Sequence, residues 1–129
     1  MIDTNVVIDM LLDREDANAA CAVIDGAELG RYKLSLCALS YTNIYYSLRK
    51  VLSRQQRIDC LTQLACVIGT VPVTGSVISA ALNSGWKDFE DAVQYFAAQE
   101  MAGITGIITR NTKDFQFSSF PVLDSRSFL

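Results

Sequence analysis

Short apolar runs alternate with amphipathic helical segments along this chain, and this alternation is the feature that most restricts its fold. The strand candidates are Met1–Asp3, Lys33–Cys37, Val71–Val73, Thr105–Thr109 and Pro121–Leu123. The helix candidates are Val6–Leu12, Ala17–Leu29, Leu39–Leu52, Arg54–Ile68, Gly75–Asn83 and Asp88–Met101. Strands joined through helices are expected to run parallel, with helices on both faces of the sheet. The pattern therefore predicts an α/β fold. The first candidate, Met1–Asp3, is short for a strand, which suggests a truncated start.

The composition narrows the chemistry that this fold can carry out. The chain has 129 residues, which predicts a single domain spanning residues 1–129, and half of its residues are hydrophobic. Its net charge is −3, so no overall positive field attracts nucleic acid, and a polyanion would need a local basic patch or a metal ion. The chain contains no histidine, which excludes histidine bases, histidine triads and zinc–histidine sites.

The four cysteines predict neither a zinc site nor a disulfide framework. Cys21, Cys37, Cys60 and Cys66 lack paired Cys-x-x-Cys spacing, and each falls within an apolar pattern. We therefore expect four reduced and mostly buried thiols. No signal peptide or membrane-length apolar run occurs in the sequence, so the cytoplasm is the expected location and no membrane contact is expected.

Acidic residues from distant segments are expected to meet at one edge of the predicted sheet. Asp3 ends the first strand candidate, Asp114 follows the Thr105–Thr109 strand, and Asp91 lies in the first turn of the helix before that strand. In parallel sheets, ligands bind beyond the carboxyl ends of the strands. Each acid also has a simpler interpretation, because Asp3 and Asp88 suit helix caps and Asp114 suits a solvated turn.

A group of carboxylates at one position calls for a divalent cation. Like charges raise each other's pKa unless a cation neutralises them, and Mg²⁺ and Mn²⁺ prefer oxygen ligands. Such an ion suits phosphate chemistry, because it binds a phosphate oxygen and orients a water molecule. The nearby Thr109, Arg110, Asn111 and Lys113 offer hydroxyl, amide and cationic contacts to a phosphate group.

Three motifs in this order resemble those of the PIN-domain nuclease superfamily. They are Asp3-Thr-Asn5, Asp88-Phe-Glu-Asp-Ala92 and Thr109-Arg-Asn-Thr-Lys-Asp-Phe115, and Leu39–Lys50 and Pro121–Asp124 extend the resemblance over nearly the whole chain. The resemblance implies a three-layer α/β/α sandwich with a mainly parallel sheet of four or five strands. It also implies an endoribonuclease that depends on Mg²⁺ or Mn²⁺. Many members, such as the VapC group, are toxins of bacterial toxin–antitoxin pairs, so a cognate antitoxin and a homodimer are implied partners.

The resemblance assigns roles to individual residues. The metal-binding, catalytic acids would be Asp3, Asp91 and Asp114, with Asp88 as a further member, either directly or through water. The polar residues that support these acids or face the phosphate would be Asn5, Asn43, Thr109, Asn111 and Arg110. The family often has a glutamate in its third helix, where this chain has Asn43. A neutral amide there predicts weaker metal affinity and a single bound ion.

Two other functions remain open on the sequence. Asn43 favours a PIN scaffold with little or no turnover, which would bind RNA or a protein partner. A phosphatase acting on small phosphate esters is also compatible with an all-oxygen metal site. A basic run, Arg49, Lys50, Arg54 and Arg57, suits either a solvated surface or a phosphate-binding track, and an apolar patch around Tyr45 and Tyr46 would suit a dimer.

Overall fold

The computed structural model describes residues 1–129, and helices and short strands alternate along it as the sequence predicts. The helices are α1 (Thr4–Leu11), α2 (Ala17–Glu28), α3 (Ala38–Ser47), α4 (Arg54–Val67), α5 (Gly75–Leu82), α6 (Phe89–Glu100) and α7 (Ser125–Phe128), with the 3-10 helix η1 (Thr112–Phe115). The strands are β1 (Ser35–Cys37), β2 (Gly69–Val71), β3 (Ile107–Ile108) and β4 (Val122–Leu123). No helix combines the length and the hydropathy that a membrane span requires.

The sheet is small and parallel, and Ile2 joins its two halves. β1 pairs with β2, and β3 pairs with β4, both in parallel. Ile2 forms parallel bridges to Leu36 of β1 and to Ile108 of β3, so the order is β2–β1–Ile2–β3–β4. The N–H of Ile2 donates to the carbonyl of Ser35 at 2.8 Å, and the N–H of Asp3 donates to Ile108 at 2.8 Å. The predicted α/β class with a mainly parallel sheet is therefore confirmed.

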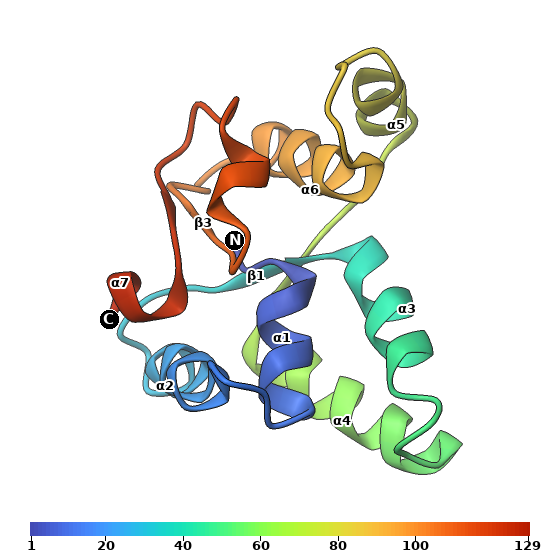
Figure 1. Cartoon of the computed structure of the whole chain (residues 1–129), viewed down its shortest axis with the longest axis vertical. Helices are drawn as coiled ribbons and strands as arrows, with labels where there is room; N and C mark the ends of the chain where they lie inside the picture. The colour runs from blue at the N-terminus through green and yellow to red at the C-terminus, as the bar shows by residue number, and fades with distance from the viewer.

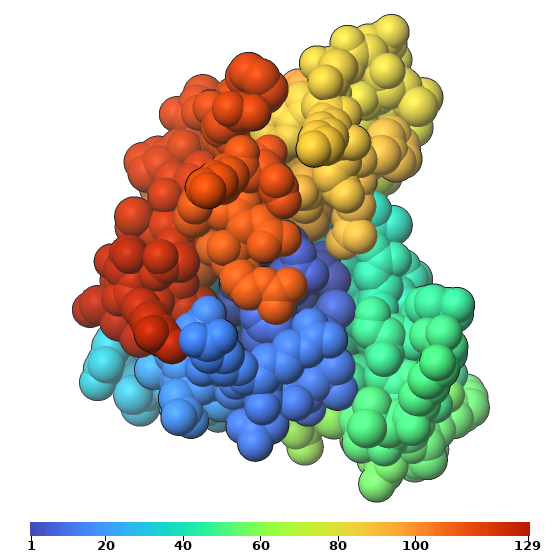
Figure 2. All heavy atoms as spheres, viewed as in Figure 1, coloured from blue at the N-terminus to red at the C-terminus, as the bar shows by residue number.

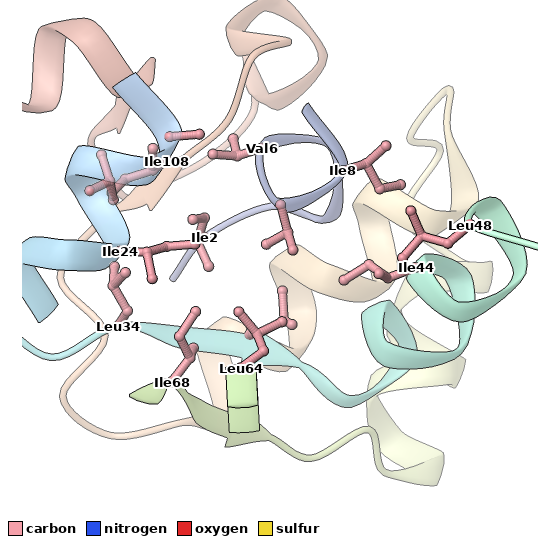
Figure 3. Close-up of a cluster of buried hydrophobic side chains, with 14 residues drawn as sticks. Ile2, Val6, Ile8, Ile24, Leu34, Ile44, Leu48, Leu64, Ile68 and Ile108 are labelled. Atoms are coloured by element: carbon pink, nitrogen blue, oxygen red, sulfur yellow. The ribbon is translucent and has the colours of Figure 1, made fainter. Parts of the chain in front are cut away.

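Neighbouring residues of each strand point to opposite faces and build two separate hydrophobic cores, because side chains alternate along a strand. Ile2, Leu36 and Ile108 belong to the first core, which packs against α1, α2, α3 and α4 (Figure 3). Met1, Cys37 and Ile107 belong to the second core, which packs against α5, α6 and η1. Figure 1 shows the sheet between these two helical layers. This arrangement is the three-layer sandwich.

Two helices differ from the sequence predictions. Helix α3 ends at Ser47 rather than at Leu52, and residues 48–52 form turns that lead into α4. Ser53 has extended backbone and caps α4 through a reciprocal pair of hydrogen bonds with Gln56. The apolar face predicted for α4 comprises Ile58, Leu61, Leu64, Ala65 and Ile68, and it is covered only in part. Leu61, Leu64 and Ile68 pack in the first core, whereas Ile58 is 38% exposed and Ala65 is also exposed.

The cysteines are unpaired, as predicted, but most of them are not buried. Cys37 is fully buried at the end of β1, Cys21 and Cys60 are half-buried, and Cys66 is exposed near the end of α4. The prediction of mostly buried thiols was wrong because three of the four lie on helices α2 and α4, whose outer faces meet solvent.

Candidate active site

Asp3 lies at the carboxyl end of the central strand position, and it is buried. Its Oδ1 accepts a hydrogen bond from Gln94 Nε2 at 2.9 Å, and its Oδ2 accepts one from Thr109 Oγ1 at 2.7 Å. Asp3 precedes α1, yet its side chain accepts no hydrogen bond from the first turn of that helix. Burial raises the pKa of Asp3, and the hydrogen bonds from Thr109 and Gln94 oppose that shift. The main hydrogen-bond partners of the carboxylate are therefore Gln94 and Thr109 rather than the first turn of α1.

A buried polar network fixes the orientation of the Asp3 carboxylate. Gln94 is fully buried in α6, and its Oε1 accepts a hydrogen bond from the Thr4 N–H at 3.3 Å. The Thr4 hydroxyl donates to Ser40 Oγ of α3 at 2.6 Å. Thr109 Oγ1 also accepts a hydrogen bond from the Asn111 N–H at 3.1 Å. The network thus connects both helical layers to the edge of the sheet.

Asp91 is a largely buried residue whose carboxylate reaches solvent and accepts no hydrogen bond within the chain. It lies in the first turn of α6, where its N–H donates to Oδ1 of the capping residue Asp88 at 3.0 Å. Only 7% of Asp91 is exposed. Burial raises its pKa to about 7, and the negative charges of Asp3, Asp88, Asp114 and Glu90 act in the same direction. A cation at this position would relieve both the burial and the repulsion.

Asp88 and Asp114 line one surface cavity of about 290 Å³ between the start of α6 and η1. Both acids are exposed, and both are close enough to Asp91 to raise its pKa. No three acidic or thiol side chains lie close enough together to hold one ion among them. The donors nevertheless suit a hard cation, because Mg²⁺ in proteins is commonly held by one or two carboxylates and several waters.

The other polar residues predicted for the site have different surroundings. Arg110 was expected to face a phosphate, but its Nη1 lies 2.7 Å from Oδ1 of the buried Asp9. Asn5, Asn43 and the side chain of Asn111 are half-buried, and their amides form no hydrogen bonds. Asn43 lies one turn after Ser40 on α3.

A family model for the PIN domain matches residues 1–113, which is most of the chain. The chain belongs to the PIN domain family. Members of this family are generally nucleases that use divalent metals. The matched range contains Asp3, Asp88 and Asp91, and it ends one residue before Asp114.

A solved structure supports the PIN fold over nearly the full length. A toxin–antitoxin complex from Klebsiella pneumoniae contains a chain that aligns with a TM-score of 0.65 and 21% sequence identity. The alignment covers 96% of this PIN domain chain and 95% of that chain. A comparison with proteins of curated function gave no significant match.

The sequence did not predict that three polar residues would form buried contacts near the site, namely Gln94, Ser40 and Asp9. Gln94 carried a usable signal, because it follows Asp91 by three residues and interrupts a run of apolar positions in α6. A polar residue on an apolar helix face needs a buried partner, and Asp3 is that partner.

Proposed function

We propose that residues 1–129 form one PIN-like domain that hydrolyses RNA phosphodiester bonds as a Mg²⁺- or Mn²⁺-dependent endoribonuclease. The observation that carries this proposal is Asp91. Only 7% of this residue is exposed, its carboxylate reaches solvent without a hydrogen-bond partner in the chain, and its pKa is raised to about 7 by burial and by neighbouring acids. Neighbouring carboxylates repel one another, and a bound cation or a proton relieves that repulsion.

The proposed roles follow from the surroundings of each side chain. Asp3 and Asp91 would hold the ion, while Asp88 and Asp114 would contribute through water or through their charge. When bound, the ion would supply a site for a phosphate oxygen and lower the pKa of a water molecule. Gln94 and Thr109 keep both oxygens of Asp3 in a fixed direction.

RNA cleavage by the purified chain tests this proposal. We expect a labelled, unstructured RNA to be cleaved with Mn²⁺ or Mg²⁺ and to stay intact with EDTA. Asp3→Asn and Asp91→Asn should each abolish cleavage while the far-ultraviolet circular dichroism stays unchanged. Asp25→Asn is the matched control, because Asp25 is exposed on α2, away from the site. Full activity in both site variants would exclude the assigned roles.

We further propose that the chain is the toxin of a toxin–antitoxin pair and acts in the cytoplasm as a homodimer. The structural relative from a toxin–antitoxin complex supports the toxin–antitoxin part of this proposal, and the homodimer follows from the family resemblance. Expression of the wild-type chain should then arrest bacterial growth, and expression of Asp91→Asn should not. The product of an adjacent small gene should restore growth. Growth arrest that persists in Asp91→Asn would contradict a nuclease toxin.

A binding module with little or no turnover is the second candidate. Two observations favour it: Asn43 stands where the family often has a glutamate, and no three acids lie close enough to share an ion. Isothermal titration with Mn²⁺, followed by the cleavage assay, separates the two functions. Neither metal binding nor cleavage would favour the binding module.

A further inference from the structure

The cavity beside the candidate active site is lined by lysines and aromatic side chains as well as by two acids. It measures about 290 Å³, and Asp88 and Asp114 form part of its lining. Its other lining residues are two lysines, two aromatic residues and a glutamine, namely Lys87, Lys113, Trp86, Phe117 and Gln116. Figure 2 shows the segment after β3, in orange, next to the start of α6 and the turn before it, in yellow-orange. A ligand in this cavity would lie beside the proposed reaction centre.

Both lysines are free to bind an anion. Lys87 and Lys113 are exposed, each immediately precedes one of the two acids that line the cavity, and neither forms a salt bridge or a side-chain hydrogen bond. The three salt bridges of the chain involve only arginines. Two unpaired ammonium groups next to a metal-binding position suit the phosphates that flank a scissile bond.

Phe117 offers an aromatic face that the fold itself does not use. The side chain is 68% exposed, although large apolar residues are normally buried. Its ring lies edge-on to Trp86, with the centroids 6.5 Å apart and the planes at 63°. Trp86 is held in turn by stacking on Tyr95 at 4.8 Å and by edge contact with Phe115 at 5.6 Å. Phe117 therefore borders on a fixed aromatic cluster.

Exposed aromatic rings next to lysines are the means by which proteins hold single-stranded nucleic acid, since each base has a face that can stack. A paired base is already stacked within its helix, so an exposed ring such as that of Phe117 could stack only on an unpaired base. A cavity of about 290 Å³ has room for a single nucleotide rather than for a duplex.

We propose that this cavity is a nucleotide subsite, in which Phe117 stacks on an unpaired base while Lys87 and Lys113 contact the adjacent phosphates. Gln116 lies at the same cavity and can exchange hydrogen bonds with a base edge. This inference rests on the proposed ribonuclease function and names the part of the substrate that the site grips: an unpaired nucleotide next to the cleaved phosphate.

Abasic RNA tests the stacking contact directly. In a short, unstructured RNA, each base in turn is removed while its sugar and phosphate stay in place, and kcat and KM are measured with Mn²⁺. For the wild type, we expect one position near the cleavage site where base removal raises KM about tenfold, with kcat changed by less than about twofold. With intact RNA, Phe117→Ala should raise KM by a similar factor. Removal of the base at that position should then cause no further rise in the KM of Phe117→Ala.

Matched variants separate stacking from general effects. Phe117→Trp should keep wild-type KM, and Phe117→Leu should resemble Phe117→Ala, because leucine is apolar but has no aromatic face. Leu29→Ala, which changes an equally exposed apolar residue on another part of the surface, should behave as wild type. An abasic penalty of equal size in the wild type and in Phe117→Ala would overturn the proposal.

The lysines are tested by the salt dependence of binding. Lys87→Ala and Lys113→Ala should each reduce the slope of log affinity against log salt concentration by about 0.7, the value for one phosphate contact on a single strand. Lys33→Ala, which removes an exposed lysine before β1, should leave the slope unchanged. Unchanged slopes in both cavity variants would overturn the phosphate contacts.

Binding without cleavage separates this inference from the ribonuclease proposal. Fluorescence anisotropy with the same RNAs, in wild type and in the Asp91→Asn background, reports on the subsite alone. Binding that depends on Phe117, without cleavage by the wild type, would reject the nuclease and retain the subsite. Cleavage that does not depend on Phe117 would retain the nuclease and reject the subsite. No RNA binding at all would reject both proposals. If Phe117→Ala lost binding to the proposed antitoxin but kept its affinity for RNA, the cavity would be a protein-docking site and the proposal would be overturned.

Discussion

Asp91 is held where its neutral form is favoured, and this property makes the stability of the fold depend on pH. Burial is the main cause, and the neighbouring negative charges add to it. Its pKa rises from an ordinary 3.8 to about 7. Between these two pH values, the folded chain therefore binds more protons at this position than the unfolded chain does, and stability falls as pH rises.

We predict that Asp91 lowers the free energy of unfolding of the metal-free wild type by about 1–2 kcal/mol between pH 4 and pH 7. Each unit of pKa shift is worth about 1.4 kcal/mol for a fully buried group, and solvent screening reduces this value for a carboxylate that reaches water. Asp91→Asn should remove this part of the pH dependence, because its amide does not titrate. Urea unfolding at four pH values, with metal removed, measures both curves. Parallel curves for the two proteins would show that Asp91 has an ordinary pKa in the folded chain.

Gln94 is the buried residue on which the orientation of Asp3 depends. Gln94→Leu keeps a similar volume but leaves Asp3 Oδ1 and the Thr4 N–H without their partner. We expect the free energy of unfolding to fall by about 1–3 kcal/mol. Gln63→Leu, at an exposed position on α4, should change it by less than about 0.5 kcal/mol. Thermal and urea unfolding of both variants check the difference, and equal effects would contradict the role of Gln94.

At this scale, the sequence predicts site residues that belong to a motif, and it does not indicate residues whose role depends on a partner from another segment. Asp3 and Asp91 belong to ordered motifs, and the structure buries both. The partner of a buried polar residue is set by whichever segment folds against it. Asp9 and Arg110 illustrate this, because nothing in their spacing indicates that they form a pair.

The pairing of Asp9 with Arg110 also connects two elements, since it joins the loop after β3 to α1. Arg110→Ala would leave Asp9 buried, with only Arg14 as a partner at 3.3 Å. A buried charge without a good partner is unfavourable, so we expect a loss of about 2–4 kcal/mol in the free energy of unfolding. Arg126→Ala breaks the more exposed pair with Asp16 and should lose less than about 1 kcal/mol.

Urea unfolding of both arginine variants at neutral pH measures these losses. A small, similar loss in the two variants would mean that Asp9 needs no partner from the loop. RNA cleavage by Arg110→Ala adds a second comparison, because the loop that carries Thr109 and Asn111 is held by this pair.

The order and type of the elements could be predicted from the sequence, but their extents could not. All the predicted strands lie in or beside the sheet. Short β-branched runs between helices favour strands, because branched side chains pack well on a pleated sheet. The strands are nevertheless only two or three residues long. In helix α4, the apolar pattern extends further along the helix than the buried face does. Such a pattern gives a buried face only where another element covers it. Ile58 has no such cover.

At the scale of the whole molecule, the sandwich places the two principal acids on different layers. Asp3 belongs to the sheet and is fixed by hydrogen bonds, whereas Asp91 belongs to α6 and has none. Their mutual repulsion therefore acts across the boundary between the sheet and the helical layer. An ion between them would replace this repulsion with attraction, so metal binding and folding should be linked.

We predict that Mn²⁺ stabilises the wild type against unfolding at pH 7.5, by about 2.7 kcal/mol when its concentration is a hundredfold above the dissociation constant. Asp91→Asn should show little stabilisation, and Asp25→Asn should match the wild type. The gain should shrink as pH falls through 7, because protons compete with the ion for Asp91. Thermal unfolding over a series of Mn²⁺ concentrations measures these shifts. Equal stabilisation of all three proteins would place the ion elsewhere on the surface and leave the repulsion between the two layers uncompensated.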